Sequence, residues 1–337
     1  MAGRQQHTIP RFVLKGFQSR VSGQQVFIWL YRRGSQPIET NTKNVGTERD
    51  FYGKPVDDQI TEVEVDHYSP LLDTLRSQQK SGPVSDAEGL PELIAHLSTR
   101  TRSLRQSMED SAEFFFEQLC ARFTNKETLA NMLRGPVARQ KILDELALRG
   151  LSAEQAQSVA PLLQPLVVRT IQDALPEMSE YAAKFLTESQ SRIPEMVRNA
   201  HLKGLAARPD RSERAESYRA FNWYVLKAEI PLVLGDTVCV FETNGERRFK
   251  PFDDADEVRR VFLPLSSRRV LVGTPHKARP KLDPVQLNKA AVRCSYEFFV
   301  SSVQLRSDSP LPLAIGKWSG VHTRDELRAI CSNFGRE

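Results

Sequence analysis

Apolar side chains recur every three or four residues along a long stretch in the middle of this chain. The run follows Pro91 and continues to about Phe123. This period places the apolar side chains on one side of an α-helix, and proline is tolerated in a first turn. The spacing therefore predicts one continuous helix with a buried stripe. Its members are Ile94, Leu97, Thr101, Leu104, Met108, Ala112, Phe115 and Leu119.

The sequence after this stretch also has helical signals. Gly135-Pro136 interrupts the chain, and the next helical segment ends at Arg149, before Gly150. Ser152-Ala153-Glu154-Gln155 has the pattern of a capping box, which starts a further helix. Prolines should divide the chain from there to about residue 205 into several helices. Residues 85–207 are therefore expected to form an α-helical block. The prolines are Pro161, Pro165, Pro176 and Pro194.

The first part of the chain has the pattern of a hairpin followed by a helix. Residues 25–31 are rich in β-branched and aromatic side chains, and a second extended stretch covers 37–42. Arg33-Gly34-Ser35 between them suits a turn. Residues 60–77 have helical spacing, with acidic residues near the start, where the helix dipole favours them. We expect residues 1–84 to form an N-terminal hairpin and helix unit.

The last part of the chain changes to short apolar runs bounded by Gly, Pro, Asn and Asp, which is typical of strands. A helix leading into a strand is expected over 285–303, and a closing helix over 324–334. Residues 208–337 are expected to be a β-rich region with closing helices. The predicted fold class is α+β, in which a mostly antiparallel C-terminal sheet packs back on the N-terminal unit. The apolar runs are 223–226, 230–234, 238–241 and 270–272.

Composition limits the classes of protein that fit. The 337 residues carry a net charge of +5, which permits contact with nucleic acid or an acidic partner without requiring either. The four cysteines are widely separated, without a CxxC pair or the spacing of a zinc site. No stretch is apolar enough for a signal peptide or a membrane span. The chain is therefore expected to be a cytoplasmic protein without a membrane segment.

Several motifs, in order, resemble the bacterial domain-of-unknown-function 4238 family. An N-terminal His-x-x-Pro-x-x-x-Leu-x-x-Phe pattern begins at His7, and an aromatic-rich strand follows at 26–31. A Gly-Asp strand turn occurs at Gly235-Asp236, and a Pro-Leu-Ser strand at 262–266. The resemblance spans residues 7 to about 302. Its other matching residues are Lys43, Glu48, Asp50, Phe51, Tyr52, Asn288, Ser295, Glu297 and Phe298.

The resemblance implies a bacterial cytosolic protein, and it does not supply a reaction. One segment departs from the family pattern. Family members often carry a Gln followed by Arg-Thr-Pro on the long helix, whereas this chain has Thr99-Arg100-Thr101-Arg102 without that Gln or Pro. A role carried over to Arg100 therefore has less support than the other matches.

The N-terminal motifs supply residues for acid–base chemistry. A histidine and carboxylates can transfer protons at a phosphodiester, and a lysine can stabilise the developing charge. The alternative is that the charged residues are solvated loop and first-turn side chains. Asp236 either belongs to the same site or makes a hydrogen-bonded Gly-Asp turn. The candidate catalytic residues are His7, Lys43, Glu48, Glu64 and Asp236, with Asp50 beside them and Asn288 as a further site residue.

Basic residues supply a candidate nucleic-acid surface. Arg100 and Arg105 fall on opposite borders of the predicted apolar stripe, from which a guanidinium can reach a phosphate. Packing of their stems against the stripe explains the same positions. In the C-terminal part, Arg268, Arg269 and Lys277 belong to a series of basic residues that strand pairing could bring onto one face. Nearby aspartates make a mixed-charge solvated surface the alternative.

Two functions follow from these observations. The first is a bacterial stress or phage-defence effector that acts on nucleic acid, by RNA cleavage through acid–base chemistry, with Mg²⁺ as the candidate cofactor. The second is a non-enzymatic binding or regulatory module that recognises a protein or a small ligand through the same cleft. The sequence contains no GxGxxG, GxxxxGK[ST], GxSxG or HExxH motif, so the usual support for nucleotide, serine-hydrolase and zinc-peptidase chemistry is missing.

Overall fold

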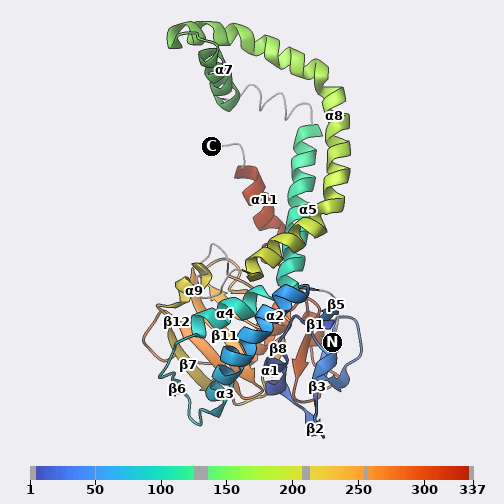
Figure 1. The fold of residues 1–337 in the computed structure, drawn as a ribbon, viewed down its shortest axis with the longest axis vertical. Helices are drawn as coiled ribbons and strands as arrows, with labels where there is room; N and C mark the ends of the chain where they lie inside the picture. The colour runs from blue at the N-terminus through green and yellow to red at the C-terminus, as the bar shows by residue number, and fades with distance from the viewer. Residues whose placement is uncertain (1–4, 50, 125–135, 207–212, 254–256, 334–337) are drawn as a thin grey trace. The chain divides into compact units, whose positions relative to one another are not determined.

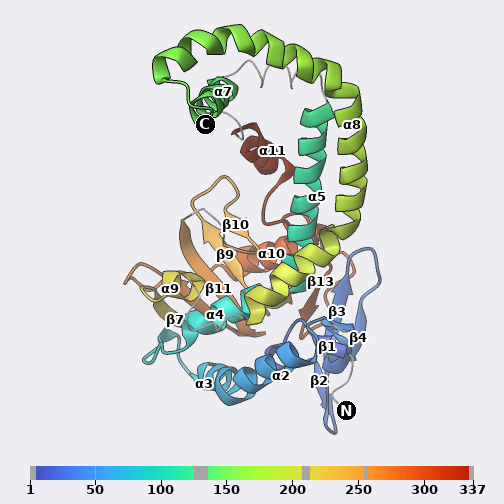
Figure 2. The same ribbon diagram turned by 45° about the horizontal axis from the view of Figure 1, so that its top comes forward.

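The computed structural model describes residues 5–49, 51–124, 136–206, 213–253 and 257–333. Contacts group the chain into two compact units (Figures 1 and 2). Unit 1 combines residues 1–108 with 197–323, and unit 2 combines 109–196 with 324–337. Unit 1 therefore contains both ends of the predicted helical block as well as the two strand-rich regions.

The N-terminal hairpin is present as predicted. Strand β3 (Gln25–Arg32) pairs antiparallel with β4 (Ile38–Asn41), and β2 (Arg20–Ser22) lies on the other side of β3. Ahead of them, β1 (Gln5–His7) pairs with β5 (Thr47–Arg49). The short helix α1 (Arg11–Leu14) and the 3-10 turns Lys15–Phe17 and Thr42–Asn44 complete this region.

The N-terminal hairpin and the C-terminal part of the chain share one sheet. Strand β13 (Phe298–Ser301) pairs with β3 on one side and with β8 (Val233–Gly235) on the other. The strand order is β2-β3-β13-β8, with β4 on β3. The α+β class and the return of the C-terminal strands to the N-terminal unit are therefore confirmed.

A second sheet of unit 1 is wholly antiparallel, in the order β10-β9-β11-β12-β7-β6. Its central strands are buried because both faces carry apolar side chains: Leu263 and Leu271 on one face, Phe262 and Val272 on the other. The strands are β6 (Gly82–Pro83), β7 (Asn222–Lys227), β9 (Val240–Thr243), β10 (Phe249–Lys250), β11 (Val258–Ser266) and β12 (Arg269–Thr274).

Helices of unit 1 complete its core. The helix predicted over 60–77 is present as α2 (Lys54–Val63) and α3 (Ser69–Ser77), joined by a π-helical turn over Glu64–Tyr68. The other helices are α4 (Leu90–Thr99), α9 (Glu213–Tyr218), α10 (Pro284–Cys294) and a 3-10 turn at Pro312–Ala314. The predicted succession of a helix and a strand over 285–303 is confirmed by α10 and β13.

The prediction of one continuous helix from Pro91 to Phe123 was wrong. Helix α4 ends at Thr99, and α5 (Arg102–Thr124) begins after a break. The hydroxyl of Thr101 accepts a hydrogen bond from the backbone N–H of Leu104 at 3.3 Å, which caps α5. Thr101 therefore starts a new helix instead of belonging to an apolar stripe. Along α5 the stripe is lost, because Met108 and Leu119 are exposed.

The prediction that prolines divide the later helices was also wrong. Helix α8 (Ala153–Ala206) is a single element that contains all four prolines. Proline has a backbone angle compatible with a helix, and it removes one hydrogen bond without disrupting those of distant turns. The capping box at its start is confirmed, since Ser152 and Gln155 exchange side-chain and backbone hydrogen bonds of 2.9 and 3.3 Å.

Unit 2 has small apolar clusters of its own. Helix α7 (Pro136–Leu148) packs on the first turns of α8 through Leu146, Ala156 and Ala160. The predicted closing helix is α11 (Arg324–Asn333), which packs through Leu327 and Cys331 on Phe114. Within the described parts of both units, none of the helices combines the length and the apolar character needed to cross a membrane.

Candidate functional site

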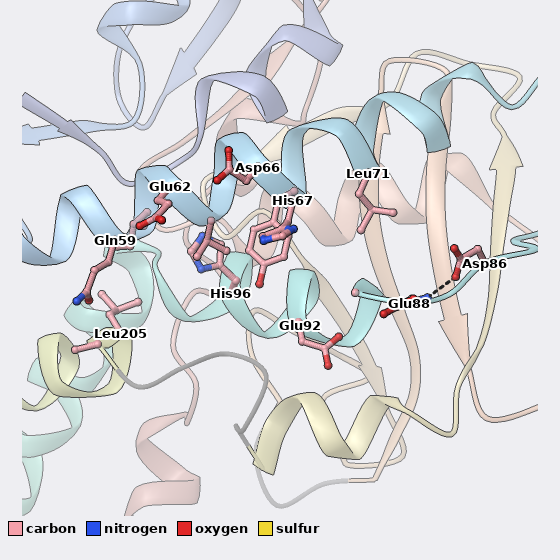
Figure 3. A pocket seen from close by; sticks show the side chains of 15 residues that line it. Gln59, Glu62, Asp66, His67, Leu71, Asp86, Glu88, Glu92, His96 and Leu205 are labelled. Carbon is pink, nitrogen blue, oxygen red and sulfur yellow. Dashed lines mark hydrogen bonds between the residues drawn. The ribbon is translucent and has the colours of Figure 1, made fainter.

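One cavity of unit 1 is a groove between two helical segments. It has a volume of about 900 Å³, within the range of small-molecule sites. Figure 3 shows labelled side chains from the α2–α3 segment on one side and from α4 and the loop before it on the other, while Leu205 comes from the end of α8. The lining residues are Gln59, Ile60, Glu62, Val63, Asp66, His67, Tyr68, Leu71, Asp86, Glu88, Gly89, Glu92, His96, Leu205 and Ala206.

The groove is acidic on both sides. Glu62 and Asp66 are one helical turn apart on the α2–α3 segment, and Glu88 and Glu92 have the same spacing on the α4 side. Asp86 adds a fifth carboxylate. None of the described lining residues is a lysine or an arginine. The apolar residues Ile60, Val63, Leu71 and Leu205 lie among these carboxylates in the lining.

One carboxylate of the groove is already paired. The guanidinium of Arg219 lies 2.9 Å from Glu92, whose side chain is 14% exposed. The remaining carboxylates of the lining give the groove a strongly negative potential, because charges of one sign in a concave surface reinforce one another. The groove can therefore attract a cation and repel an anion.

The π-helical turn brings two residues of the helix against His96. Oε1 of Glu64 lies 2.9 Å from Nε2 of His96, and the rings of Tyr68 and His96 have centroids 4.9 Å apart. A π turn widens the helix by one residue, and such turns are frequent at functional sites. Because a carboxylate only accepts hydrogen bonds, His96 donates through Nε2 and its Nδ1 is the acceptor in the neutral ring.

Arg100 connects the groove to the N-terminal strand. Its guanidinium forms an ion pair with Glu64 and donates to the carbonyl of His7 and, over 3.2 Å, to the hydroxyl of Tyr52. The Tyr52 hydroxyl in turn donates to the Arg100 carbonyl at 3.0 Å. Arg100 is 2% exposed, so its charge is balanced inside the fold by Glu64.

Burial keeps the histidines of this region neutral. Burial lowers the pKa of His96 to about 4. It also lowers the pKa of His7 to about 4, and the positive charges of Arg11 and Arg100 act in the same direction. The pKa of His201, which donates through Nε2 to the carbonyl of Thr99 at 2.6 Å, is lowered by burial as well. These rings therefore act as neutral hydrogen-bonding groups at pH 7.

Two of the sequence-predicted catalytic residues meet at Arg100, namely His7 through its carbonyl and Glu64 through its carboxylate. Glu48 lies on the neighbouring strand and pairs with Arg105 at 2.5 Å. Lys43 is exposed, in the 3-10 turn Thr42–Asn44, and Asp50 is outside the described residues. The structure therefore brings His7 and Glu64 close to one buried arginine and leaves the side chain of Lys43 in solvent.

Asp236 is not among the described residues that line the groove. Its carboxylate accepts hydrogen bonds from the backbone N–H groups of Tyr296, Glu297 and Phe298 at 2.7, 2.6 and 3.0 Å. Burial raises its pKa to about 6, against the effect of these three bonds. It lines a small cavity of about 130 Å³ that also contains Thr8 but does not include His7 among its described lining. The geometry is that of a carboxylate that fixes a turn.

Asn288 fixes the same sheet from α10. Its side-chain oxygen accepts from the N–H of Val233 at 3.0 Å, and its amide donates to the carbonyl of Pro231 at 2.8 Å. Asn288 is 6% exposed and does not line the groove among the described residues. Its bonds hold the start of β8 to α10.

The predicted nucleic-acid-binding residues are dispersed over unit 1. Arg105 pairs with Glu48, Arg268 donates to the carbonyl of Glu229, and Arg269 donates to the carbonyl of Gln78. Lys277 is exposed in the turn after β12. None of these side chains is among the described residues that line the groove.

Sequence reasoning missed His96 as a site residue. The signal that could have found it is its position four residues before Arg100, which puts both side chains on one face of a helix. The carboxylates spaced four residues apart at 62/66 and 88/92 could also have been identified from the sequence. Their convergence from two helices depends on the packing of α4 against the α2–α3 segment, which no local pattern reveals.

The described residues contain no group of three or more His, Cys, Asp or Glu side chains arranged to hold a metal ion. The carboxylates of the groove therefore do not converge on one point in the way that a metal-binding site requires.

The fold and the site together define an α+β protein with two antiparallel sheets and an acidic groove between helices of its larger unit. Residues 5–302 match the family described as protein of unknown function (DUF4238), and the chain belongs to this family. Comparison with curated proteins and with solved structures gives no match.

Proposed function

We propose that this protein is a binding or regulatory module whose groove between the α2–α3 segment and α4 takes a small, positively charged ligand. The observation that carries the proposal is the charge of the groove: carboxylates from both helical segments line it, without a lysine or arginine among its described lining residues. A cavity of this size with few convergent polar groups and titratable residues of altered pKa is the usual form of a ligand site.

The lining residues suit an organic cation better than a bare metal ion. Apolar side chains, including Ile60 and Leu71, would contact aliphatic carbon, while the carboxylates would pair with ammonium or guanidinium groups. The rings of Tyr68 and His96 add aromatic surface next to which a cation is stabilised. His96, held by Glu64, would accept a hydrogen bond from the ligand through its second ring nitrogen.

Calorimetric titration with aliphatic amines tests the proposal. Spermidine and 1,4-diaminobutane serve as probes, with citrate as the anionic comparison. We expect heat of binding for the amines, an affinity that falls as salt rises, and no binding of citrate. The double variant Glu62→Gln/Asp66→Asn should bind the amines more weakly by up to about tenfold, the combined effect of two partly exposed ion pairs.

The matched control removes two carboxylates of unit 1 that do not line the groove. Glu229→Gln/Asp308→Asn changes the net charge by the same amount at exposed positions. If this control weakens binding as much as the groove variant does, the amines are held by net charge alone and the proposed site is wrong. Absence of binding to folded wild-type protein would also reject it.

RNA cleavage in a stress or phage-defence effector is the second candidate. The observation in its favour is that His7 and Glu64 both contact Arg100, with His96 beside them. Labelled RNA and DNA are incubated with the protein, with and without Mg²⁺, and His96→Ala and His7→Ala are compared with Arg269→Ala. Loss of a general acid or base should reduce the rate on the order of 10²–10⁴-fold, whereas Arg269→Ala should remain largely active.

The bacterial cytoplasm is the compartment that we infer. All four cysteines are free thiols, which suits a reducing compartment. Fractionation of cells that express a tagged chain tests this inference, and recovery in the periplasm with oxidised cysteines would contradict it.

A further inference from the structure

A second charged cavity of unit 1 lies at the start of α10, and it has the opposite sign from the groove. Its volume is about 210 Å³, enough for one small group. The described lining includes three cations, Arg248, Arg260 and Lys281, with Asp283 as the single carboxylate. The rings of Phe249 and Phe262 form an apolar wall. This site, called here the β9–β11 cavity, is separate in its described lining from the acidic groove.

Two arginines of the cavity are fixed by one buried carboxylate. Glu242 on β9 stands opposite Phe249 of β10 and Arg260 of β11 in the strand register, so Arg260 reaches it from β11 and Arg248 from the position just before β10. Arg248 approaches its Oε1 at 2.7 Å, and Arg260 donates through Nε to its Oε2. The Glu242 side chain is 6% exposed, so the pair of guanidiniums is held rigidly at the sheet surface.

The aromatic rings and one carbonyl orient the guanidiniums further. Arg248 lies 5.1 Å from the ring centre of Phe249, and Arg260 lies 5.3 Å from that of Phe262. Arg260 also donates through Nη1 to the carbonyl of Lys281 at 3.1 Å. Each guanidinium has five N–H donors, so donors remain after these bonds are counted.

The charges of the cavity do not balance. Glu242 and Asp283 offset two of the three cations, and Asp283 also accepts from the N–H of Gln286 at 3.0 Å at the N-terminus of α10. One positive charge is left over, and the structure gives Lys281 no ion pair with any described carboxylate. Excess positive charge beside an apolar wall and a helix N-terminus favours an anion.

We infer that the β9–β11 cavity is an oxyanion-binding site that accepts a phosphate or carboxylate group between Arg248, Arg260 and Lys281. The two arginines offer planar, fixed donors, and Lys281 offers a mobile point charge. The volume admits the anionic group and not a whole nucleotide. The ligand is therefore an anionic group that enters from solvent.

Thermal unfolding in the presence of inorganic phosphate or acetate tests the inference, with sodium chloride at the same ionic strength as the reference. We expect phosphate, acetate or both to raise the melting temperature above the value in chloride, in a saturable way. A preference for phosphate identifies a phosphate ester as the natural group, and a preference for acetate identifies a carboxylate. Equal melting temperatures in all three salts would overturn the inference.

Substitutions of the lining cations test whether the anion binds in this cavity. Lys281→Gln and Arg248→Gln should each weaken the apparent affinity for the anion on the order of tenfold, because each loses one charge-assisted hydrogen bond. Lys289→Gln, which removes an exposed charge of α10 outside the described lining, is the matched control. A loss of the same size in Lys289→Gln would show that the anion binds by net charge, and the site would be rejected. The Lys281 ammonium has no hydrogen bond or ion pair with a described residue, so Lys281→Gln remains informative if Arg248→Gln fails to fold.

Discussion

Oε1 of Glu64 lies 2.9 Å from Nε2 of His96, although 32 positions separate the two residues. The same carboxylate pairs with Arg100, one helical turn beyond His96. Glu64 therefore serves two partners of opposite character: a neutral ring that it orients and a buried cation that it neutralises. The contact joins the π turn to α4, and it places an acid–base pair against the acidic groove.

Arg100→Met should destabilise the protein by about 3–5 kcal/mol, because it leaves the buried carboxylate of Glu64 without its cation. Urea denaturation followed by circular dichroism measures the loss. The double variant Arg100→Met/Glu64→Gln should regain part of it, since both charges are then gone. Arg102→Gln is the control: its side chain is 49% exposed, and it should cost less than about 1 kcal/mol. Equal losses in the two single variants would contradict the buried-pair interpretation.

Stability should fall on mild acidification. The pKa of His96 is about 4 in the folded protein, below the 6.5 of an unfolded chain, so the unfolded state binds the proton first. The contribution is present above pH 6.5 and is lost as the pH falls towards 4. For His96 the loss between pH 7 and pH 5 should be about 2 kcal/mol; His7 acts in the same direction, whereas Asp236, whose pKa burial raises to about 6, acts in the opposite direction.

Urea midpoints at pH 5, 6 and 7 test this pH dependence. His96→Gln should show a shallower fall than the wild type, because the glutamine does not titrate. A midpoint that falls equally in the wild type and in His96→Gln would mean that His96 takes up protons in the folded state as readily as in the unfolded chain.

Asp236→Asn should cost about 2–3 kcal/mol. The carboxylate accepts three backbone N–H bonds, and an asparagine presents an NH₂ group where one of the two oxygens stood. At least one N–H group is then left without an acceptor. Thermal unfolding measures the effect. A variant as stable as the wild type would indicate that Asp236 is free for chemistry instead of being committed to the turn.

Gly235→Ala should be strongly destabilising, because a Cβ at this position would collide with the Ser295 hydroxyl and lie 2.7 Å from the carbonyl oxygen of Ala291. Strand β8 can therefore approach α10 this closely only because residue 235 has no side chain. Gly204→Ala is the matched comparison: no atom lies within 4 Å of its added Cβ, and it should stabilise α8 by about 0.5–1 kcal/mol. Opposite signs for the two substitutions are expected in the same denaturation assay.

Local patterns predicted most elements of unit 1. The β3–β4 hairpin, the α2–α3 helix and the order of α10 and β13 follow from side-chain period and turn residues, which act over a few positions. Thr101 was misread because a threonine at an apolar spacing was counted as packing, whereas its hydroxyl caps α5. The four prolines of α8 were predicted to end helices because proline disrupts the hydrogen bonds of its own turn. The surrounding turns keep their hydrogen bonds, so the helix continues through all four.

The candidate site was less predictable than the fold. His7 and Glu64 were singled out from the sequence, and Arg100 was placed in a different class of residue, yet all three belong to one network. Their meeting depends on the packing of α4 against β1 and the π turn, over long separations in sequence. The negative charge of the groove could not be predicted either, because a net charge of +5 for the whole chain does not indicate where carboxylates are in local excess.

The pairing of β3 with β13 has a consequence for synthesis on the ribosome. Leu30 meets Val300 in the register of this sheet, so its central pair cannot form until nearly the whole chain has left the exit tunnel. Strand β3 is synthesised first, and it lacks β13 while the residues of unit 2 are translated between the two halves of unit 1. A chain that stops short of residue 298 would leave residues 29–32 of β3 without a partner on the side away from β4, and such an exposed strand edge is a template for aggregation. Premature termination should therefore leave insoluble product rather than a folded fragment.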